Sequence, residues 1–229
     1  MRAEAVAFEL APKPGNMPGD DAEARGPLRG DPHLGDYRFR ALLRERDWAS
    51  LPAAIRRRFS KRLPPGGSTV YAGEVLETRM NIGGWLLAQA LRLIGAPLPT
   101  TRCVHVPSVV TVTEDKASGG QIWTRIYARR NGFPQVVHSS KRFAGPSGLE
   151  EYVGYGVGMA LDLLVREGAL IFRSRNYFVQ MFGRRFVLPA WLCPGELTVI
   201  HAEVPDGRFS FSVGLASVVT AKGSGEPAP

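Results

Sequence analysis

Residues 149–182 read LEEYVGYGVGMALDLLVREGALIFRSRNYFVQMF, a long run with strand-like alternation and repeated glycines. Side chains of a β-strand point alternately to the two faces of a sheet. In the first arm, residues 149–165, one face of the strand includes Gly154, Gly156 and Gly158 and therefore carries few side chains. Glycines repeated on one face weaken a strand unless they permit sharp curvature or the close approach of another group. The pattern therefore predicts one long curved strand that pairs, across a short turn, with a second arm at 169–182.

Long curved antiparallel strands form barrels or half-barrels, and their concave faces often hold an apolar ligand. The rest of the sequence fits that architecture. Turn signals at Asn131-Gly132 and Asp206-Gly207 indicate hairpins between neighbouring strands. Further strands are predicted from their residue alternation at 68–79, 105–114, 121–130, 135–143, 185–189, 198–203 and 208–219. We expect a mainly β (α+β) fold, built on a curved antiparallel sheet or barrel of about eight strands.

Two helical segments complete the expected fold. Residues 37–59 have an amphipathic pattern that is interrupted near Pro52, which predicts an N-terminal helical arm. Residues 85–94 (WLLAQALRLI) are apolar on nearly every side. A helix of this kind is buried or packed into an apolar opening, so we expect it to cover the sheet or plug the barrel. Residues 1–36 and 221–229 are predicted to be disordered tails around a single ligand-binding domain at 37–220.

The composition is that of a folded protein with excess positive charge. Of the 229 residues 44% are hydrophobic, which is sufficient for a core, and the formal net charge is +8. Much of the excess is arginine spread along the chain. The densest cluster, at 56–58 and 61–62, lies at the end of a predicted helix, where cations interact well with the helix dipole. Capping and solubility are a sufficient explanation of this cluster, so no nucleic acid partner is expected.

The sequence gives no sign of a membrane span, a leader or a metal site. No uncharged apolar run reaches membrane-spanning length, and the first residues lack the apolar core of a signal peptide. We therefore expect a cytoplasmic protein without a transmembrane segment. The four histidines and two cysteines do not have the spacing of a metal site, so no metal is expected.

Several short motifs, in this order, resemble a bacterial family, the group of domain of unknown function 4166. They are Trp123-Thr124-Arg125-Ile126-Tyr127, Phe133, Ser139, Gly148-Leu149-Glu150-Glu151, Leu188-Pro189-Ala190-Trp191-Leu192 and Asp206-Gly207-Arg208-Phe209-Ser210-Phe211. Members of this family occur alone or behind a saccharopine-dehydrogenase-like or short-chain oxidoreductase domain. The resemblance implies a partner in small-molecule or lipid metabolism and assigns no catalytic residue. Since no G-x-G-x-x-G fingerprint opens a helix here, we expect no cofactor, and any dehydrogenase activity would belong to a separate protein.

The strand predicted at 121–130 carries the first candidate ligand-binding residues. Trp123, Arg125 and Tyr127 alternate on one of its faces, where two aromatic rings flank a guanidinium group. Such a group binds a carboxylate or phosphate with two hydrogen bonds. The same stripe could equally lie on the exterior, with the arginine stacked on its aromatic neighbours. His138, on the strand at 135–143, and Tyr155, in the first arm, are the other candidates outside the second arm.

Two acids are the candidate catalytic residues. Asp162 falls on the glycine face of the first arm, and Glu74 lies between two apolar positions of the strand at 68–79. If these faces are concave, burial raises the pKa of such an acid and suits it to general acid–base chemistry. If they face solvent, the acids are ordinary surface groups. Arg173 and Arg175 of the second arm are the available counter-charges, and we include them among the candidate ligand-binding residues.

These patterns support three functional hypotheses. The leading one is that a β-barrel pocket binds a hydrophobic small molecule, such as a lipid, an isoprenoid or a polyketide-like compound. The second is a cofactor-independent cyclase, isomerase or dehydratase that uses Asp162 or Glu74 in the same pocket. The third is an accessory domain that docks onto an oxidoreductase. The sequence does not decide between binding and catalysis.

Overall fold

The computed structural model describes residues 5–11, 36–78, 81–93, 105–129, 131–205 and 208–216. The helices are α1 (Glu45–Ala49), α2 (Ala53–Ser60) and α3 (Ile82–Leu93), with the short 3-10 helices η2 (Arg40–Leu42) and η3 (Ala190–Leu192). The strands are β1 (Ala5–Ala11), β2 (Ser68–Thr78), β3 (Val106–Glu114), β4 (Gln121–Tyr127), β5 (Gln135–Arg142), β6 (Glu150–Gly154), β7 (Val157–Arg166), β8 (Ala169–Met181), β9 (Arg184–Val187), β10 (Glu196–Val204) and β11 (Arg208–Ala216).

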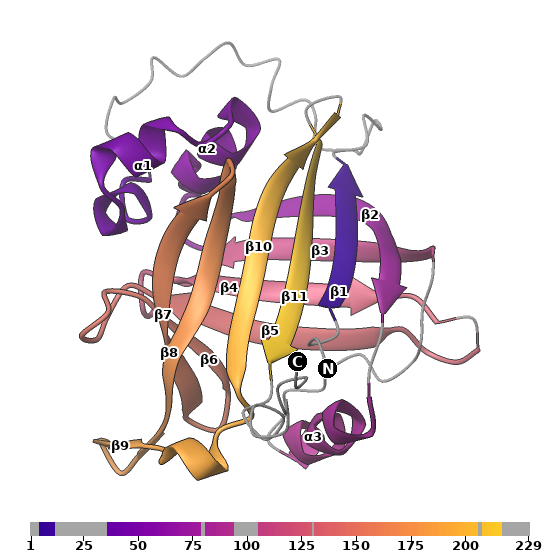
Figure 1. Cartoon of the computed structure of the whole chain (residues 1–229), viewed down its shortest axis with the longest axis vertical. Coiled ribbons are helices and arrows are strands. Elements are labelled where there is room, and N and C mark those ends of the chain that lie inside the picture. Colours follow the sequence, from indigo (N-terminus) through magenta and orange to yellow (C-terminus); the bar gives the residue numbers. More distant parts are fainter. Residues whose placement is uncertain are drawn as a thin grey trace, which may run out of the picture.

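The strands form one antiparallel sheet that closes on itself. Its order is β10-β11-β1-β2-β3-β4-β5-β6-β7-β8-β9, and an additional pairing of β8 with β10 joins the two sides. The short strand β9 extends beyond this ring and pairs with β8. Figure 1 shows β2 to β5 crossing behind β7, β8, β10, β11 and β1 at a steep angle. The mainly β, curved antiparallel architecture expected from the sequence is confirmed.

The N-terminal helical arm is also confirmed, and it covers one end of the barrel (Figure 1). Its apolar side chains, including those of Phe39, Ile55 and Phe59, are buried in the same core as the barrel strands. The Phe59 ring centroid lies 5.6 Å from that of Phe172 on β8, and the Phe39 ring lies 4.8 Å from that of Phe143. This end of the barrel is therefore filled by side chains from the arm.

The prediction of one continuous curved strand in the first arm is wrong. The chain instead makes a hairpin between β6 and β7, with Tyr155 and Gly156 in its turn at φ values of 44° and 76°. Positive φ at both central residues is the geometry of the two-residue turns that match strand twist. A Cβ on Gly156 would overlap the carbonyl oxygen of Gln180, and one on Gly158 would lie 2.7 Å from the Phe178 ring. The repeated glycines thus permit a tight turn and the close approach of neighbouring groups, as predicted. They do so in a hairpin of two strands and not in one curved strand.

Part of the predicted N-terminal tail belongs to the sheet. Residues Ala5–Ala11 form β1, which pairs with β11 on one side and β2 on the other. The segment AVAFELA places larger apolar residues at every second position, which is the period of a strand. Together with the split of the first arm, β1 explains why the sheet has more strands than expected.

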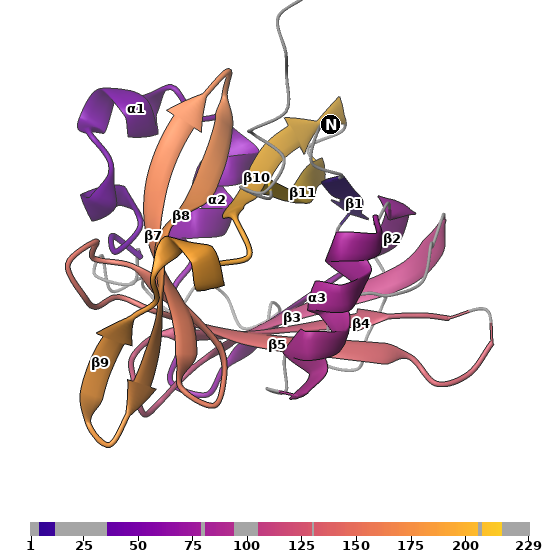
Figure 2. The ribbon, with the colours of Figure 1, turned by 60° about the horizontal axis from the view of Figure 1, so that its bottom comes forward.

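The apolar helix forms as α3, but it is not buried as predicted. Within the described helix, Ala88 is fully buried, whereas Ile82, Trp85, Leu86 and Leu93 are exposed. Ile94, the last residue of the predicted helix, lies outside the described residues. Figure 2 shows α3 beside the end of the barrel that faces away from α1 and α2. The uniform apolar composition was evidence for a helix, but it did not identify what the helix contacts.

Candidate functional site

A buried arginine, Arg58 of α2, enters the interior of the barrel. Its helix buries Ala54, Ile55 and Phe59, and a residue three or four positions along an α-helix lies on the same face. All three guanidinium nitrogens are buried and have no hydrogen-bond partner among the described residues. Burial lowers the pKa of Arg58 to about 10, so the group remains a cation near neutral pH. An unpaired buried cation of this kind is energetically costly.

Aromatic rings provide part of the compensation for this charge. The Arg58 Cζ atom lies 3.7 Å from the ring centroid of Phe209, 4.3 Å from that of Tyr71 and 5.4 Å from that of Trp123. Aromatic faces attract cations, but they accept no strong hydrogen bonds from the guanidinium N–H groups. The donors of Arg58 therefore remain available to an anionic acceptor.

Next to Arg58 lies a network of three ionised side chains contributed by β4, β5 and β6. Lys141 and Glu151 are opposite each other in the register, and the Lys141 Nζ donates to Glu151 Oε2 at 2.8 Å. The Arg125 Nη2 atom lies 3.8 Å from Glu151 Oε1, and its Nη1 donates to Ser139 Oγ at 3.0 Å. Burial alone raises the pKa of Glu151, but the charges of Lys141 and Arg125 and hydrogen bonds from Lys141 and Ser139 lower it to about 2. Burial also lowers the pKa of Lys141, against the attraction of Glu151.

His201 of β10 completes the polar part of the interior. It is buried among aromatic rings, with centroids 5.1 Å from Phe59, 5.4 Å from Phe172 and 5.9 Å from Phe211. Burial, followed by the charges of Arg58, Lys141 and Arg125, lowers the pKa of His201 well below its ordinary value. Its imidazole is therefore neutral near neutral pH, and its Nδ1 has no hydrogen-bond partner among the described residues.

The charges of this cluster do not balance. Arg58, Arg125 and Lys141 contribute three positive charges, and Glu151 contributes one negative charge. The buried acid Glu114 is paired with Arg38 of the helical arm at 2.8 Å, so it does not neutralise the cluster. Among the described residues, this cluster thus has an excess of two positive charges beside aromatic rings.

The free space beside Arg58 is small in this structure. A cavity of about 20 Å³ is lined by Arg58, Tyr71, Thr69, Gln121 and Trp123, among others. Its volume is enough for a single water molecule. A wider depression of about 460 Å³ lies elsewhere, against Pro52, the turn at 167–168 and the end of β10, and none of the interior cations lines it. Anything larger than water reaches Arg58 only if side chains or α2 move.

The interior becomes apolar away from α2. Val199 of β10 and Val213 of β11 are directly paired and half-buried, and both pack against the core together with Val137 and Val153. Tyr177 is buried nearby on β8 and donates from its hydroxyl to the Gly195 carbonyl oxygen at 2.9 Å. The barrel therefore has a cationic, aromatic region under α2 and an apolar region toward the other end.

Three sequence-predicted site residues lie in this interior. Trp123, Arg125 and Tyr127 share the inward face of β4, as one of the two interpretations of that strand required. Burial raises the pKa of Tyr127 to about 12. The Arg125 Cζ atom lies 5.6 Å from the Trp123 ring centroid, so this arginine contacts both the aromatic wall and the ionic network.

The other candidate residues lie outside the barrel interior. Asp162 is on the outer face, where its Oδ1 lies 2.6 Å from Arg175 Nη2 and its Oδ2 lies 4.0 Å from Arg173 Nη2. Glu74 is exposed beside His105, at 3.3 Å. The concave placement that would have supported catalysis by either acid is therefore not found.

Two further candidates occupy ordinary surface positions. His138 is exposed on β5, where its Nδ1 lies 3.0 Å from the Thr124 hydroxyl. Tyr155 is 80% exposed in the β6–β7 turn. Side chains alternate between the two faces of β5, so His138 lies on the opposite face from Ser139 and Lys141. Ser139 and Lys141 are buried in the barrel interior.

Sequence reasoning missed Arg58, Lys141, Glu151 and His201 as site residues. Arg58 was assigned to a solvated basic cluster, although its spacing from Ala54 and Ile55 places it on the apolar face of its helix. Glu151 alternates with Leu149 and Val153, and Lys141 alternates with Val137 and Ser139. Charged residues that alternate with apolar residues on one face were the signal that could have identified Lys141 and Glu151.

Comparison with known proteins supports the family resemblance and adds no activity. The model of the family described as Domain of unknown function (DUF4166) matches residues 51–220. Searches of curated proteins and of solved structures found no significant match. The described residues contain no cluster of three or more potential metal-ligating side chains. Within the same residues, no helix is both long and apolar enough to cross a membrane.

Proposed function

The chain belongs to the DUF4166 family, whose description names no activity, and we propose from its interior that the barrel binds a hydrophobic small molecule carrying an anionic group. The anionic group contacts Arg58, with Arg125 and Lys141 nearby. The apolar part extends toward Val199 and Val213. Fatty acids, isoprenoid phosphates and carboxylated polyketide-like compounds share this chemistry.

The observation that carries the proposal is the state of Arg58. Its guanidinium group is buried, cationic and without a hydrogen-bond acceptor among the described residues. A carboxylate or phosphate would accept two of its N–H groups and reduce the excess positive charge of the interior. The surrounding rings of Tyr71, Trp123 and Phe209 would contact the adjoining hydrocarbon. A single water in the cavity is the alternative acceptor, and it would leave the excess charge unchanged.

Binding in this position requires a conformational change. The cavity beside Arg58 has room for a water molecule, whereas an anionic lipid also needs space for its chain. The proposal therefore includes either an outward shift of α2, which packs on β10 and β11, or separation of the half-buried valines at the other end. Either movement opens the barrel. A ligand that binds the open state better than the closed state shifts the equilibrium between them toward the open state.

The enzymatic hypothesis has weaker support. Asp162 is paired with Arg175 on the outer face, and Glu74 is exposed. Inside the barrel, Glu151 has a pKa of about 2 and is held by Lys141, which suits a fixed counter-charge better than a group that exchanges protons near neutral pH. We therefore favour a carrier or binding protein over a cyclase, isomerase or dehydratase.

Native mass spectrometry of the purified protein tests this proposal. We expect a bound species that solvent extraction releases and that carries a carboxylate or phosphate. The variant R58M keeps an unbranched apolar stem, which is shorter than the arginine side chain, and removes the charge, and it should lose that species. The control R57M changes a neighbouring exposed arginine on the same helix and should retain it. Retention of the same species by R58M would contradict the role of Arg58.

The stability of R58M checks that loss of ligand is not loss of fold. Replacing an uncompensated buried charge by an apolar side chain is often stabilising, so we expect the free energy of unfolding of ligand-free R58M to rise by about 1–2 kcal/mol. A large decrease would instead indicate that Arg58 has an acceptor in the ligand-free protein.

A further inference from the structure

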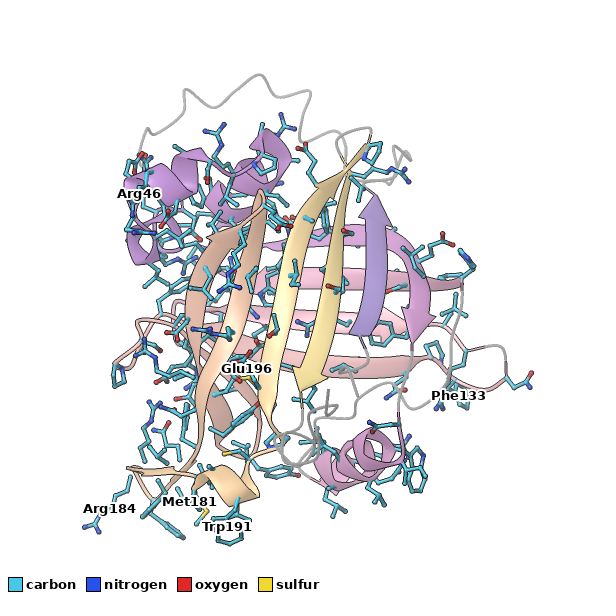
Figure 3. The ribbon with its side chains drawn as sticks, viewed as in Figure 1. Arg46, Phe133, Met181, Arg184, Trp191 and Glu196 are labelled. Carbon is cyan, nitrogen blue, oxygen red and sulfur yellow. The ribbon has the colours of Figure 1, made fainter. Side chains whose placement is uncertain are left out.

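Exposed apolar side chains gather at the end of the molecule opposite the helical arm. We call this surface the apolar end. Its residues are Met181, Phe182, Phe186, Val187, Trp191 and Leu192 from the β8–β9 hairpin and η3, and Ile82, Trp85, Leu86 and Leu93 from α3. Figure 1 and Figure 2 both place α3, β9 and η3 away from α1 and α2, and Figure 3 shows Met181, Arg184 and Trp191 projecting from this end.

The helix α3 contributes exposed apolar side chains along one side to this surface. Ile82, Leu86 and Leu93 are separated by four and seven residues, which places them along one side of a helix. All three are exposed, and Ile82 and Leu93 are more than four-fifths exposed. A helix on the surface of a globular protein normally exposes its polar side chains to water. An exposed apolar stripe therefore indicates a site of contact with a membrane or another molecule.

The β8–β9 hairpin presents aromatic rings at its tip. Phe182 is 96% exposed and occupies the turn at φ 51°, followed by Gly183 at φ 72°. Positive φ favours glycine, asparagine or aspartate, so the local conformation gives no reason for a phenylalanine there. Trp191 of η3 is 80% exposed on the same end. Aromatic rings at an exposed tip are typical of side chains that enter the interface of a lipid bilayer.

The charge of the apolar end has one sign. Residues 82–93 and 181–192 contain Arg92, Arg184 and Arg185 and no acidic residue. Arg184 is exposed and forms no ion pair with the described residues, whereas Arg185 is paired with Glu150. The whole chain has a formal net charge of +8. An apolar surface that also carries arginines is complementary to a membrane that contains anionic lipids.

We propose that the apolar end docks on the surface of an anionic lipid bilayer, with Phe182 and Trp191 in the interface and Arg184 at the level of the phosphates. The inference does not rest on the proposed ligand, because the docking residues lie outside the barrel interior. It assigns a partner to the predicted apolar helix, whose described side chains are mostly not buried by the fold. A peripheral contact of this type needs no membrane-spanning helix.

Vesicle flotation with purified full-length protein tests the proposal. Wild-type protein should float with phosphatidylcholine vesicles that contain phosphatidylglycerol, and less with vesicles of phosphatidylcholine alone. Binding should weaken as salt increases, because salt screens the attraction of the arginines to anionic headgroups. The double variant F182S/W191S should bind at least about ten-fold more weakly, since each lost ring removes a large buried apolar area.

A matched control distinguishes docking from a general effect of aromatic residues. Tyr37 is 57% exposed and lies in the helical arm at the opposite end, so Y37S should bind vesicles as wild type does. Circular dichroism melts of all three proteins check that the fold is intact. Failure of wild-type protein to float with anionic vesicles overturns the proposal, as does an equal loss in Y37S. Self-association that F182S/W191S abolishes, without vesicle binding, overturns it in favour of a second copy of this chain.

Discussion

Replacing Glu151 by glutamine should cost a large part of the stability of the barrel. Glu151 is the anion of a buried cluster that includes Lys141 and Arg125, and the amide of E151Q keeps the shape but not the charge. Two buried cations would then lack their counter-charge. Breaking a buried ion pair by removing one partner typically costs about 3–5 kcal/mol.

The pKa of Glu151 gives an independent magnitude. It falls from 4.5 to about 2 on folding, and one pKa unit corresponds to about 1.4 kcal/mol. The ionised group therefore contributes on the order of 3 kcal/mol to the free energy of unfolding. Because the folded pKa is the lower one, this contribution is complete above pH 4.5 and is lost as the pH falls toward about 2. The two magnitudes agree.

Urea denaturation followed by tryptophan fluorescence measures the effect. We expect E151Q to lose about 3 kcal/mol near neutral pH and to have a flatter pH dependence than wild type between pH 4.5 and about 2. The double variant E151Q/K141M should recover part of the loss, because it removes one unpaired charge as well.

The control is D162N, which breaks the half-exposed pair of Asp162 with Arg175 on the outer face. Exposed pairs contribute about 0–1 kcal/mol, so D162N should be near wild type. A loss below about 1 kcal/mol in E151Q, or equal losses in both variants, would refute the assignment of Glu151 as the counter-charge of the interior.

Three further outcomes follow from the fold. G156A should destabilise the protein more than G183A in thermal melts: both glycines have positive φ, but a Cβ on Gly156 would overlap the Gln180 carbonyl and one on Gly183 meets nothing within 4 Å. Equal melting temperatures would show that the β6–β7 turn relaxes freely. L87A in the half-buried part of α3 should cost less than about 1.5 kcal/mol in urea denaturation, whereas L161A in the barrel core should cost about 2–5 kcal/mol, and a larger loss for L87A would place α3 in the core. D162N should leave ligand binding unchanged in the mass spectrometric assay, because Asp162 faces outward. Loss of binding in D162N would indicate that Asp162 belongs to the ligand site.

The sequence predicted the sheet well because alternation and hairpin turns are local signals. The strands that became β3, β4 and β5 lie close to their predicted ranges, and Trp123, Arg125 and Tyr127 share a face as expected. Residues 149–165 were harder, since glycine permits both a bend and a turn and only the pairing with β8 distinguishes them.

The cationic interior depends on information that no short segment contains. Lys141 meets Glu151 through strand register, and Arg58 reaches the rings of Tyr71 and Phe209 through the docking of α2 on the barrel. In the sequence, Arg58 is one of three consecutive arginines, and its neighbours Arg56 and Arg57 are exposed. The helical period places Arg58 on a different face of α2 from Arg56 and Arg57. The charge of the cluster nevertheless suggested that all three arginines are exposed to solvent.

The function proposed for the barrel is recognition of an anionic group on an apolar molecule. The most direct measurement is the dissociation constant of wild-type protein for two ligands of equal chain length, an alkyl carboxylate and the corresponding alkyl alcohol. Hydrogen bonds to a charged group contribute about 1.5–3 kcal/mol, so the carboxylate should bind at least about ten-fold more tightly, and R58M should remove most of that difference. Equal affinity for the two ligands, or no binding of either, would contradict the claim.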